Sequence, residues 1–177
     1  MVMDTMNNPN KQYKVFLVDD EPMVHKLVGG QLKLIDGLDI KSFYNGEDMI
    51  EEIDQHPDIV VLDFHMDTVK KDAMNGLETM MQILELSPET KVIMLSSQDA
   101  IGTAVNVLKK GAVDYIVKDG VFGVKTKGAV EKVIQGIALK EEIKELTTRI
   151  KRDKLVMRGF LLIILFLILS ISVFIAR

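Results

Sequence analysis

Five short apolar runs alternate with longer amphipathic stretches between Lys14 and Val117. Most of the runs are rich in β-branched residues and are bounded by polar or turn residues, which is typical of buried β-strands. The second run is the weakest prediction, because Lys41 and Ser42 interrupt it. The predicted strands are Val15–Val18, Ile40–Phe43, Ile59–Leu62, Val92–Leu95 and Tyr115–Val117.

The amphipathic stretches between these runs predict four helices. In each of them, apolar residues recur three or four positions apart, so that one face of the helix can pack on a sheet. Strands that alternate with helices predict an α/β fold, a doubly wound five-stranded parallel sheet with helices on both faces. The predicted helices are Met23–Leu34, Glu47–Gln55, Gly76–Leu86 and Ala100–Lys109.

A fifth and much longer helix is expected to begin near residues 124–128 and to continue, without a proline, through Arg158 into the segment beyond. Within 139–157, apolar residues are spaced four, three, four and seven positions apart, with Asp153 at the gap. This heptad seam is under three heptads long and leaves two interpretations open: a coiled coil that pairs two copies as a homodimer, or a solvated basic connector helix over 139–158. The seam residues are Leu139, Ile143, Leu146, Ile150 and Met157.

The segment Gly159–Ala176 contains 18 residues and no charge. As a helix it would be about 27 Å long, close to the thickness of the hydrocarbon core of a bilayer, so we predict a single-pass transmembrane helix at 159–176. Five basic residues and one acid lie within 149–158, whereas Arg177 alone follows the segment. The positive-inside rule therefore places the preceding domain on the cytoplasmic side of the membrane, held by a tail anchor.

Charge is divided unevenly along the chain. Residues 1–125 hold 21 acidic and 12 basic side chains and residues 126–177 hold 5 and 10, which together give the net charge of −4. The acidic first part argues against a nucleic-acid partner. The absence of cysteine excludes disulfides, thiolate metal sites and a cysteine nucleophile. Residues 1–12 lack the apolar run of a signal peptide and are expected to form a flexible tail.

Side chains that can carry chemistry follow four of the five predicted strands. Asp19 and Asp20 come after the first strand, Asp63 after the third, Ser96 after the fourth and Lys118 after the fifth. Because ligands of an open parallel sheet bind outside the carboxyl ends of its strands, we expect these side chains to converge on one edge. Each alone has a simpler interpretation as a helix cap, a turn residue or a surface lysine, and their joint placement favours a site.

The chemistry of such a cluster is specific. Crowded carboxylates repel one another unless a proton or a cation neutralises them. Oxygen ligands of this kind suit Mg²⁺, which binds one or two carboxylates together with a phosphate oxygen. A carboxylate can also act as a nucleophile and accept a phosphoryl group as an acyl phosphate when positive charge is close by. The pattern therefore predicts Mg²⁺-dependent phosphorylation of an aspartate, with Lys118 balancing the charge of the transferred group.

Five segments make the chain resemble a response-regulator receiver domain of two-component signalling over residues 13–138. The most specific is KKGAVDYIVK (Lys109–Lys118), which combines a Gly-Ala turn, an aromatic residue and a terminal lysine. The resemblance implies a sheet of strand order 2-1-3-4-5. The other four segments are VFLVDDEP (Val15–Pro22), IVVLDFHM (Ile59–Met66), NGLE (Asn75–Glu78) and VIMLSSQD (Val92–Asp99).

The same resemblance implies roles for the acidic residues. Asp63 would accept a phosphoryl group from a histidine kinase or a phosphotransfer protein. Asp20 and Asp63 would bind Mg²⁺ together with the backbone carbonyl of His65. Asp19 would act on the ion through a water molecule, outside the direct ligands of the metal.

Further roles follow from the resemblance for residues on the neighbouring strands. Ser96 and Lys118 would bind the phosphoryl oxygens. Tyr115 would be the switch aromatic, which turns inward when Ser96 moves toward the phosphate. His65 and Gln98 would set the lifetime of the aspartyl phosphate.

Two features depart from the family's pattern. Asp119 stands where the family usually has proline, so we expect a trans peptide bond or a strained turn, and a carboxylate that competes for the charge of Lys118. The loop after the third strand carries an insertion at 67–74, which would shield the phosphate, bind a partner or be a neutral surface insertion. His25 and His56 fit no such pattern and are expected at the surface.

The expected function is that of a membrane-tethered receiver without an output module of its own. It would signal to a downstream membrane-associated protein by contact or by phosphorelay, and its catalysis would be limited to gaining and losing its own phosphate. Basic residues within 149–158 would add attraction to anionic lipid. Two alternatives remain: a receiver-like scaffold that is not phosphorylated, and a phosphate-ester hydrolase, which usually needs a second acid where His65 stands.

Overall fold

A computed structural model describes residues 11–66, 74–97 and 101–175 of the chain. Side chains are described throughout these ranges apart from residues 101, 167, 169–171 and 173–175. The chain divides into two compact units, Met1–Gln135 and Gly136–Arg177. The predicted flexible tail and the predicted insertion at 67–74 lie mostly outside the described residues.

Five parallel strands form the sheet of the first unit, in the order β2-β1-β3-β4-β5. Because all neighbours in this order are parallel, each connection between consecutive strands is a crossover that carries a helix. The order confirms the predicted doubly wound sheet. The strands are β1 (Tyr13–Val18), β2 (Leu38–Phe43), β3 (Ile59–Asp63), β4 (Lys91–Ser96) and β5 (Asp114–Val117).

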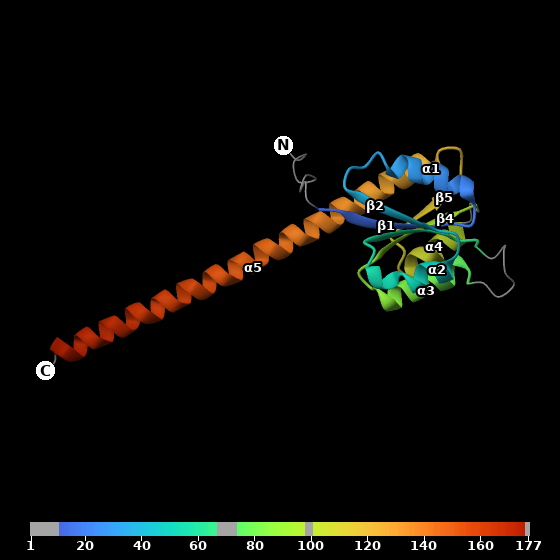
Figure 1. Cartoon of the computed structure of the whole chain (residues 1–177). Coiled ribbons are helices and arrows are strands. Elements are labelled where there is room, and N and C mark those ends of the chain that lie inside the picture. The colour runs from blue at the N-terminus through green and yellow to red at the C-terminus, as the bar shows by residue number, and fades with distance from the viewer. Residues whose placement is uncertain (1–10, 67–73, 98–100, 176–177) are drawn as a thin grey trace. The chain divides into compact units, whose positions relative to one another are not determined.

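Helices cover both faces of this sheet. Helix α1 and the start of α5 lie on one face, and α2, α3 and α4 lie on the other (Figure 1). The start of α5 approaches α1 closely, since a Cβ atom on Gly123 would lie 3.6 Å from the carbonyl oxygen of Leu27. The helices are α1 (Pro22–Leu32), α2 (Gly46–Glu51), α3 (Gly76–Leu86), α4 (Ile101–Lys109) and α5 (Phe122–Ile175).

One predicted helix is divided in the structure. Residues 47–55 were expected to form a single helix, but α2 ends at Glu51 and a short 3₁₀ helix, η1, follows at Ile53–Gln55. His56 then adopts a left-handed backbone conformation, with a φ of 50°. Pro57 explains why the helical segment stops after Gln55, because a residue that precedes proline is driven away from the α-helical region.

The central strands β1, β3 and β4 supply nearly half of the buried apolar residues. Strands that are covered by helices on both faces form continuous apolar runs, which explains why the sequence pattern identified them. The rings of Phe16 and Phe43 lie 4.8 Å apart and join β1 to the edge strand β2. The main cluster of buried apolar residues is Phe16, Val18, Phe43, Met49, Ile53, Val60, Leu62, Met66, Met80, Ile83, Val92, Met94, Val107 and Ala112.

The start of α3 is fitted against the end of β3. Asn75 caps this helix, because its side chain accepts the N–H of Glu78 and the side chain of Glu78 accepts the N–H of Asn75. Gly76 follows the cap, and a Cβ atom there would lie 2.0 Å from the carbonyl oxygen of Asp63. Only a residue without a Cβ atom permits this approach, so α3 abuts the backbone of Asp63.

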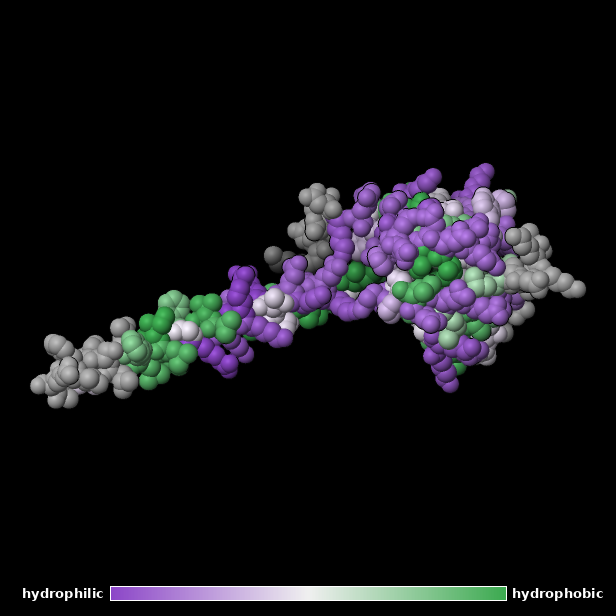
Figure 2. Space-filling view, turned by 60° about the horizontal axis from the view of Figure 1, so that its bottom comes forward, coloured by the Kyte–Doolittle hydropathy of each residue, from purple (hydrophilic) through white to green (hydrophobic). Residues whose placement is uncertain are grey.

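The second unit consists of the later part of α5, which runs to Ile175. Hydrophobic side chains gather toward the end of the described helix, and hydrophilic ones precede them (Figure 2). Among the residues that the structure describes, no helix combines the length and the apolar character needed to cross a membrane. The predicted transmembrane segment, 159–176, lies partly outside the described residues.

We expect Gly76→Ala to destabilise the first unit by about 2 kcal/mol or more, because the added methyl group must displace the backbone of Asp63. Gly30→Ala is the matched control, since this α1 glycine has open space around its Cβ position and should stabilise the unit by about 0.5–1 kcal/mol. Urea unfolding followed by tyrosine fluorescence measures both changes, because the three tyrosines all lie in the first unit. Equal effects of the two substitutions would contradict the tight fit of α3 on β3.

Candidate functional site

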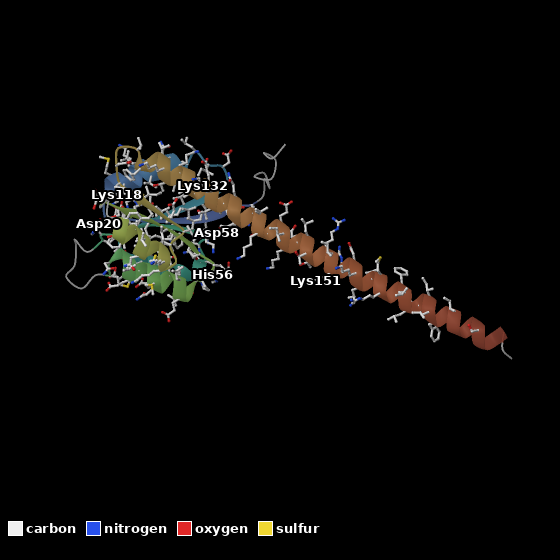
Figure 3. All side chains as sticks on the ribbon, turned by 180° about the vertical axis from the view of Figure 1, so that it is seen from behind. Asp20, His56, Asp58, Lys118, Lys132 and Lys151 are labelled. Atoms are coloured by element: carbon white, nitrogen blue, oxygen red, sulfur yellow. The ribbon has the colours of Figure 1, made fainter. Side chains whose placement is uncertain are left out.

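The carboxyl ends of the strands bring the predicted side chains together at one edge of the sheet. Val18 pairs with Leu62, and Asp63 pairs with Leu95, so Asp19, Asp63 and Ser96 follow one another across adjacent strands. Lys118 comes directly after β5. Figure 3 shows Lys118 and Asp20 at this edge of the sheet, whereas His56 and Asp58 lie toward the opposite edge.

Lys118 is the centre of this group. Its Nζ atom lies 2.8 Å from Asp19 Oδ2, 3.1 Å from Asp63 Oδ1 and 3.6 Å from Glu21 Oε1. Only 9 % of the Lys118 side chain is exposed, and its backbone N–H donates to the carbonyl of Ser96 at 2.7 Å. The convergence predicted from the strand ends is thus confirmed for Asp19, Asp63 and Lys118.

Asp19 is held by its backbone as well as by its side chain. Its N–H donates to the carbonyl of Phe43 at 3.1 Å, which ties it to the end of β2. Its Oδ1 atom accepts the N–H of Glu21 at 3.0 Å, so that Oδ2 is left to face Lys118. Because Asp19 is fully buried, these contacts fix the position of a negative charge inside the protein.

His25 corrects one prediction from the sequence. It was expected at the surface, but its Nε2 atom lies 2.6 Å from the carbonyl oxygen of Asp19. The imidazole is half-buried, its Nδ1 atom meets no hydrogen-bond partner among the described residues, and its ring lies 4.5 Å from that of Tyr44. The periodicity of α1 alone gives no sign of this contact, since the contact depends on where β1 ends. His56, by contrast, is exposed as predicted.

Burial sets the protonation of the site. Burial, and then the negative charge of Asp19, raise the pKa of Asp63 to about 6, although Lys118 opposes the shift. Burial also raises the pKa of Asp19, again against the effect of Lys118. For Lys118 itself, burial acts to lower the pKa, but the bond to Asp19 and the charge of Asp63 outweigh burial, so the pKa is raised. The ammonium therefore stays charged while the carboxylates are costly to ionise.

A metal ion would relieve this excess of negative charge. Among the described residues, Asp19, Asp20 and Glu21 each place one carboxylate oxygen within 4.8 Å of the others. Asp19 Oδ2 and Asp63 Oδ1 are buried and lie 2.8 and 3.1 Å from the Lys118 ammonium. Hard oxygen atoms of this kind fit Mg²⁺. Sequence reasoning left Glu21 out of the site residues, although its place beside Asp20 was a signal.

The predicted magnesium ligands are only partly brought together. Asp20 groups with Asp19 and Glu21, whereas Asp63 is joined to Asp19 through the Lys118 ammonium. The backbone N–H of His65 donates to the Asp63 carboxylate, which acts to lower the pKa of Asp63 against the effect of burial. The His65 ring is half-buried and lies edge-on to Phe64 at 4.8 Å.

The remaining predicted residues are placed as follows. Ser96 is fully buried at the end of β4. Tyr115 lies in β5, half-buried and packed against the apolar core. Gln98 lies outside the described residues.

Asp119 behaves differently from the prediction. The peptide bond between Lys118 and Asp119 is trans, in agreement with the absence of proline. The Asp119 carboxylate pairs with Lys125 and accepts the N–H of Val121, both near the start of α5. This pairing lowers the pKa of Asp119. The expected competition for the charge of Lys118 was therefore wrong, because the turn directs Asp119 onto α5 instead.

We expect Asp63→Asn to raise the free energy of unfolding at pH 7 by about 1–3 kcal/mol when divalent cations are absent. Folding raises the pKa of Asp63 to about 6, so the folded state binds this proton more tightly than the unfolded state does. The wild type should therefore gain stability as the pH falls from about 6 to about 4, and the variant should gain less, because it keeps only the contribution of Asp19, whose pKa is also raised.

Urea unfolding across this pH range measures the difference. Asp54→Asn, an exposed position in η1, is the matched control and should follow the wild type. If the free energies of unfolding of wild type and Asp63→Asn changed with pH in parallel, the raised pKa of the buried Asp63 would be contradicted.

Sequence comparison identifies relatives of this arrangement. The family described as the response regulator receiver domain matches residues 15–122. The chemotaxis protein CheY of Listeria monocytogenes is 36 % identical over 106 residues, which cover 59 % of this chain and 85 % of that protein. The nitrogen assimilation regulatory protein NtrX of Azorhizobium caulinodans is 30 % identical over 136 residues, which cover 76 % of this chain and 29 % of NtrX.

Solved structures agree with the sequence comparison. NtrX from Brucella abortus superimposes with a TM-score of 0.66 at 26 % identity, covering 76 % of this chain and 29 % of that one. The BeF3-activated receiver domain of DrrB from Thermotoga maritima gives a TM-score of 0.60 at 27 % identity, covering 70 % of this chain and 98 % of that domain. With its sheet order, its strand-end carboxylates and its buried lysine, the chain belongs to the response regulator receiver domain family.

Proposed function

We propose that this chain is a response regulator that accepts a phosphoryl group on Asp63 from a histidine kinase or a phosphotransfer protein. The observation that carries the proposal is the environment of the Asp63 carboxylate. It is buried at the end of β3, 3.1 Å from the Lys118 ammonium, and the N–H of His65 donates to it. A carboxylate held in this way has a defined direction of attack and a nearby positive charge.

The transfer itself exchanges one bond for another. An oxygen atom of the Asp63 carboxylate forms a bond to phosphorus, and the bond between phosphorus and the donor's nitrogen breaks, with its electron pair leaving on the donor. Lys118 and the hydroxyl of Ser96 bind the phosphoryl oxygens. Because Lys118 already touches both Asp19 and Asp63, it can follow the charge as it moves outward from the carboxylate.

Magnesium completes the charge balance in this proposal. When bound, Mg²⁺ supplies the positive charge that offsets the carboxylates and the incoming phosphate. Asp20 and Asp63 would hold it with the backbone carbonyl of His65, and Asp19 would act through water. Glu21, whose side chain is 63 % exposed, would contact water around the ion.

Output would begin at the neighbouring strands. Movement of Ser96 toward the phosphate would open space for Tyr115 to turn inward, and a partner protein would read the changed surface. The relatives named above differ beyond their receiver parts, and this chain matches only 29 % of NtrX. The downstream partner is therefore proposed by kind alone: a membrane-associated protein that receives either contact or phosphate. His65 and Gln98 would set how long the phosphate lasts.

A membrane tether completes the proposed function. The uncharged segment 159–176 and the five bases before it support a single-pass anchor with the receiver on the cytoplasmic side. The bases within 149–158 would add roughly 1 kcal/mol each of attraction to anionic lipid. Anchoring would concentrate the receiver near membrane-bound partners.

The full chain incubated with a small phosphodonor and Mg²⁺ should gain the mass of one phosphoryl group. Asp63→Asn should remove this gain completely, because the amide that replaces the proposed acceptor carboxylate is not a nucleophile for the phosphoryl group. Asp54→Asn is the matched control and should be phosphorylated like the wild type. An unchanged mass of the wild type would leave a receiver-like scaffold as the better account.

In the same phosphorylation assay, His65→Ala should change the rate at which the phosphoryl group is lost from the chain. An unchanged rate would remove His65 from control of the phosphate lifetime.

The tether predicts that the full chain stays in the membrane fraction after an alkaline carbonate wash. The double substitution Leu165→Arg and Ile168→Arg should release it, because each charge costs about 2.5–3.5 kcal/mol in the middle of a spanning helix. Thr148→Arg, outside the span, is the matched control and should remain bound. Release of the wild type by the wash would contradict the anchor.

A further inference from the structure

The second unit carries an apolar stripe that its own residues leave uncovered. Leu139, Ile143, Leu146 and Ile150 are each between 50 and 58 % exposed. They recur at spacings of four, three and four, so they lie along one side of α5. In the part of the chain that the structure describes, 139–157 is exposed at every position.

The opposite side of the same helix is charged. Glu141, Lys144, Glu145, Lys151 and Arg152 occupy the positions between the stripe residues and are exposed. A helix with one apolar stripe and one charged side is built to be covered along the stripe and hydrated elsewhere. The remaining question is what covers it.

The composition of the stripe selects a second copy of this chain. In heptad terms, Ile143 and Ile150 fall at the a positions and Leu139 and Leu146 at the d positions. β-branched residues at a with leucine at d favour a parallel coiled coil of two strands. In two identical copies related by a parallel twofold axis, each stripe residue would face the same residue of the other copy.

The apolar seam is interrupted after Ile150. Asp153 falls at the next d position, and Arg149 and Lys154 flank it at g and e. In a parallel pair, Arg149 of one copy would face Lys154 of the other, and Asp153 would face Asp153, so this layer opposes pairing. The pairing therefore depends on the four apolar layers from Leu139 to Ile150.

We propose that residues 139–157 form a parallel two-stranded coiled coil with the same segment of a second copy of this chain. The seam has only two full apolar heptads, so two free helices of this length would pair weakly. The proposed membrane tether strengthens the pairing, because confinement to one surface raises the effective concentration of the second copy. The seam itself rests on residue types and exposure, and not on phosphorylation of Asp63.

Cysteine crosslinking in the full chain tests the pairing, because the chain has no cysteine of its own. Leu139→Cys and Leu146→Cys, each alone, should form disulfide-linked dimers in membranes treated with a catalytic oxidant. Thr148→Cys, on the charged side, is the matched control and should form about tenfold less dimer. Crosslinking at both 139 and 146 specifies the parallel register, since in an antiparallel pair at most one of the two positions meets its own copy.

A second substitution separates the seam from random collision. Ile143→Asp added to Leu146→Cys should abolish the dimer, whereas Thr148→Asp added to Leu146→Cys should leave it. Both changes lie outside the first unit, so neither acts on the fold of the receiver. Equal crosslinking at positions 146 and 148, or crosslinking at only one of 139 and 146, overturns the proposal.

Three separate measurements distinguish the coiled coil from the membrane tether and from phosphorylation. If no disulfide-linked dimer forms, the coiled-coil proposal is overturned, whether or not the protein is in the membrane fraction. The presence of the protein in the membrane fraction tests the tether. The mass gain on Asp63 is measured separately and depends on neither.

Discussion

One ammonium group surrounded by carboxylates organises this receiver. Lys118 lies within ion-pair distance of Asp19, Asp63 and Glu21, which come from two different strand ends, and its own backbone is bonded to β4. Bringing several acids out of water is unfavourable unless positive charge comes with them. The sheet meets that requirement by placing Lys118 directly after β5, with its backbone N–H bonded to the last residue of β4, so fold and charge balance depend on each other.

Sequence reasoning was most successful where a physical requirement acts within a few residues. Fully covered strands must be apolar, which identified β1, β3 and β4, and the parallel topology then placed Asp19, Asp63 and Lys118 at one edge. The edge strand β2 gave a weak pattern because, of its residues, only Phe43 is buried. Contacts that depend on tertiary placement were missed, as His25 on the Asp19 carbonyl and Asp119 on Lys125 demonstrate.

The two units are governed by different rules. The first is held by a buried core, and its chemistry depends on charges taken out of water. In the second, every described residue from 139 to 157 is exposed, and its information lies in the order of apolar and charged positions along a helix. The heptad order can be read from the sequence, and the residue types at its a and d positions favour a second copy of the chain as the partner.

The close fit of Gly76 on Asp63 has a consequence for how a signal leaves the site. With helix α3 seated against the strand end, the backbone of Asp63, the proposed acceptor, cannot move toward that helix without unseating it. In the proposed function, the volume of an added phosphoryl group would therefore be accommodated in the segments after β4 and β5. The acceptor would be the stationary part of the device, and displacement would fall on its neighbours.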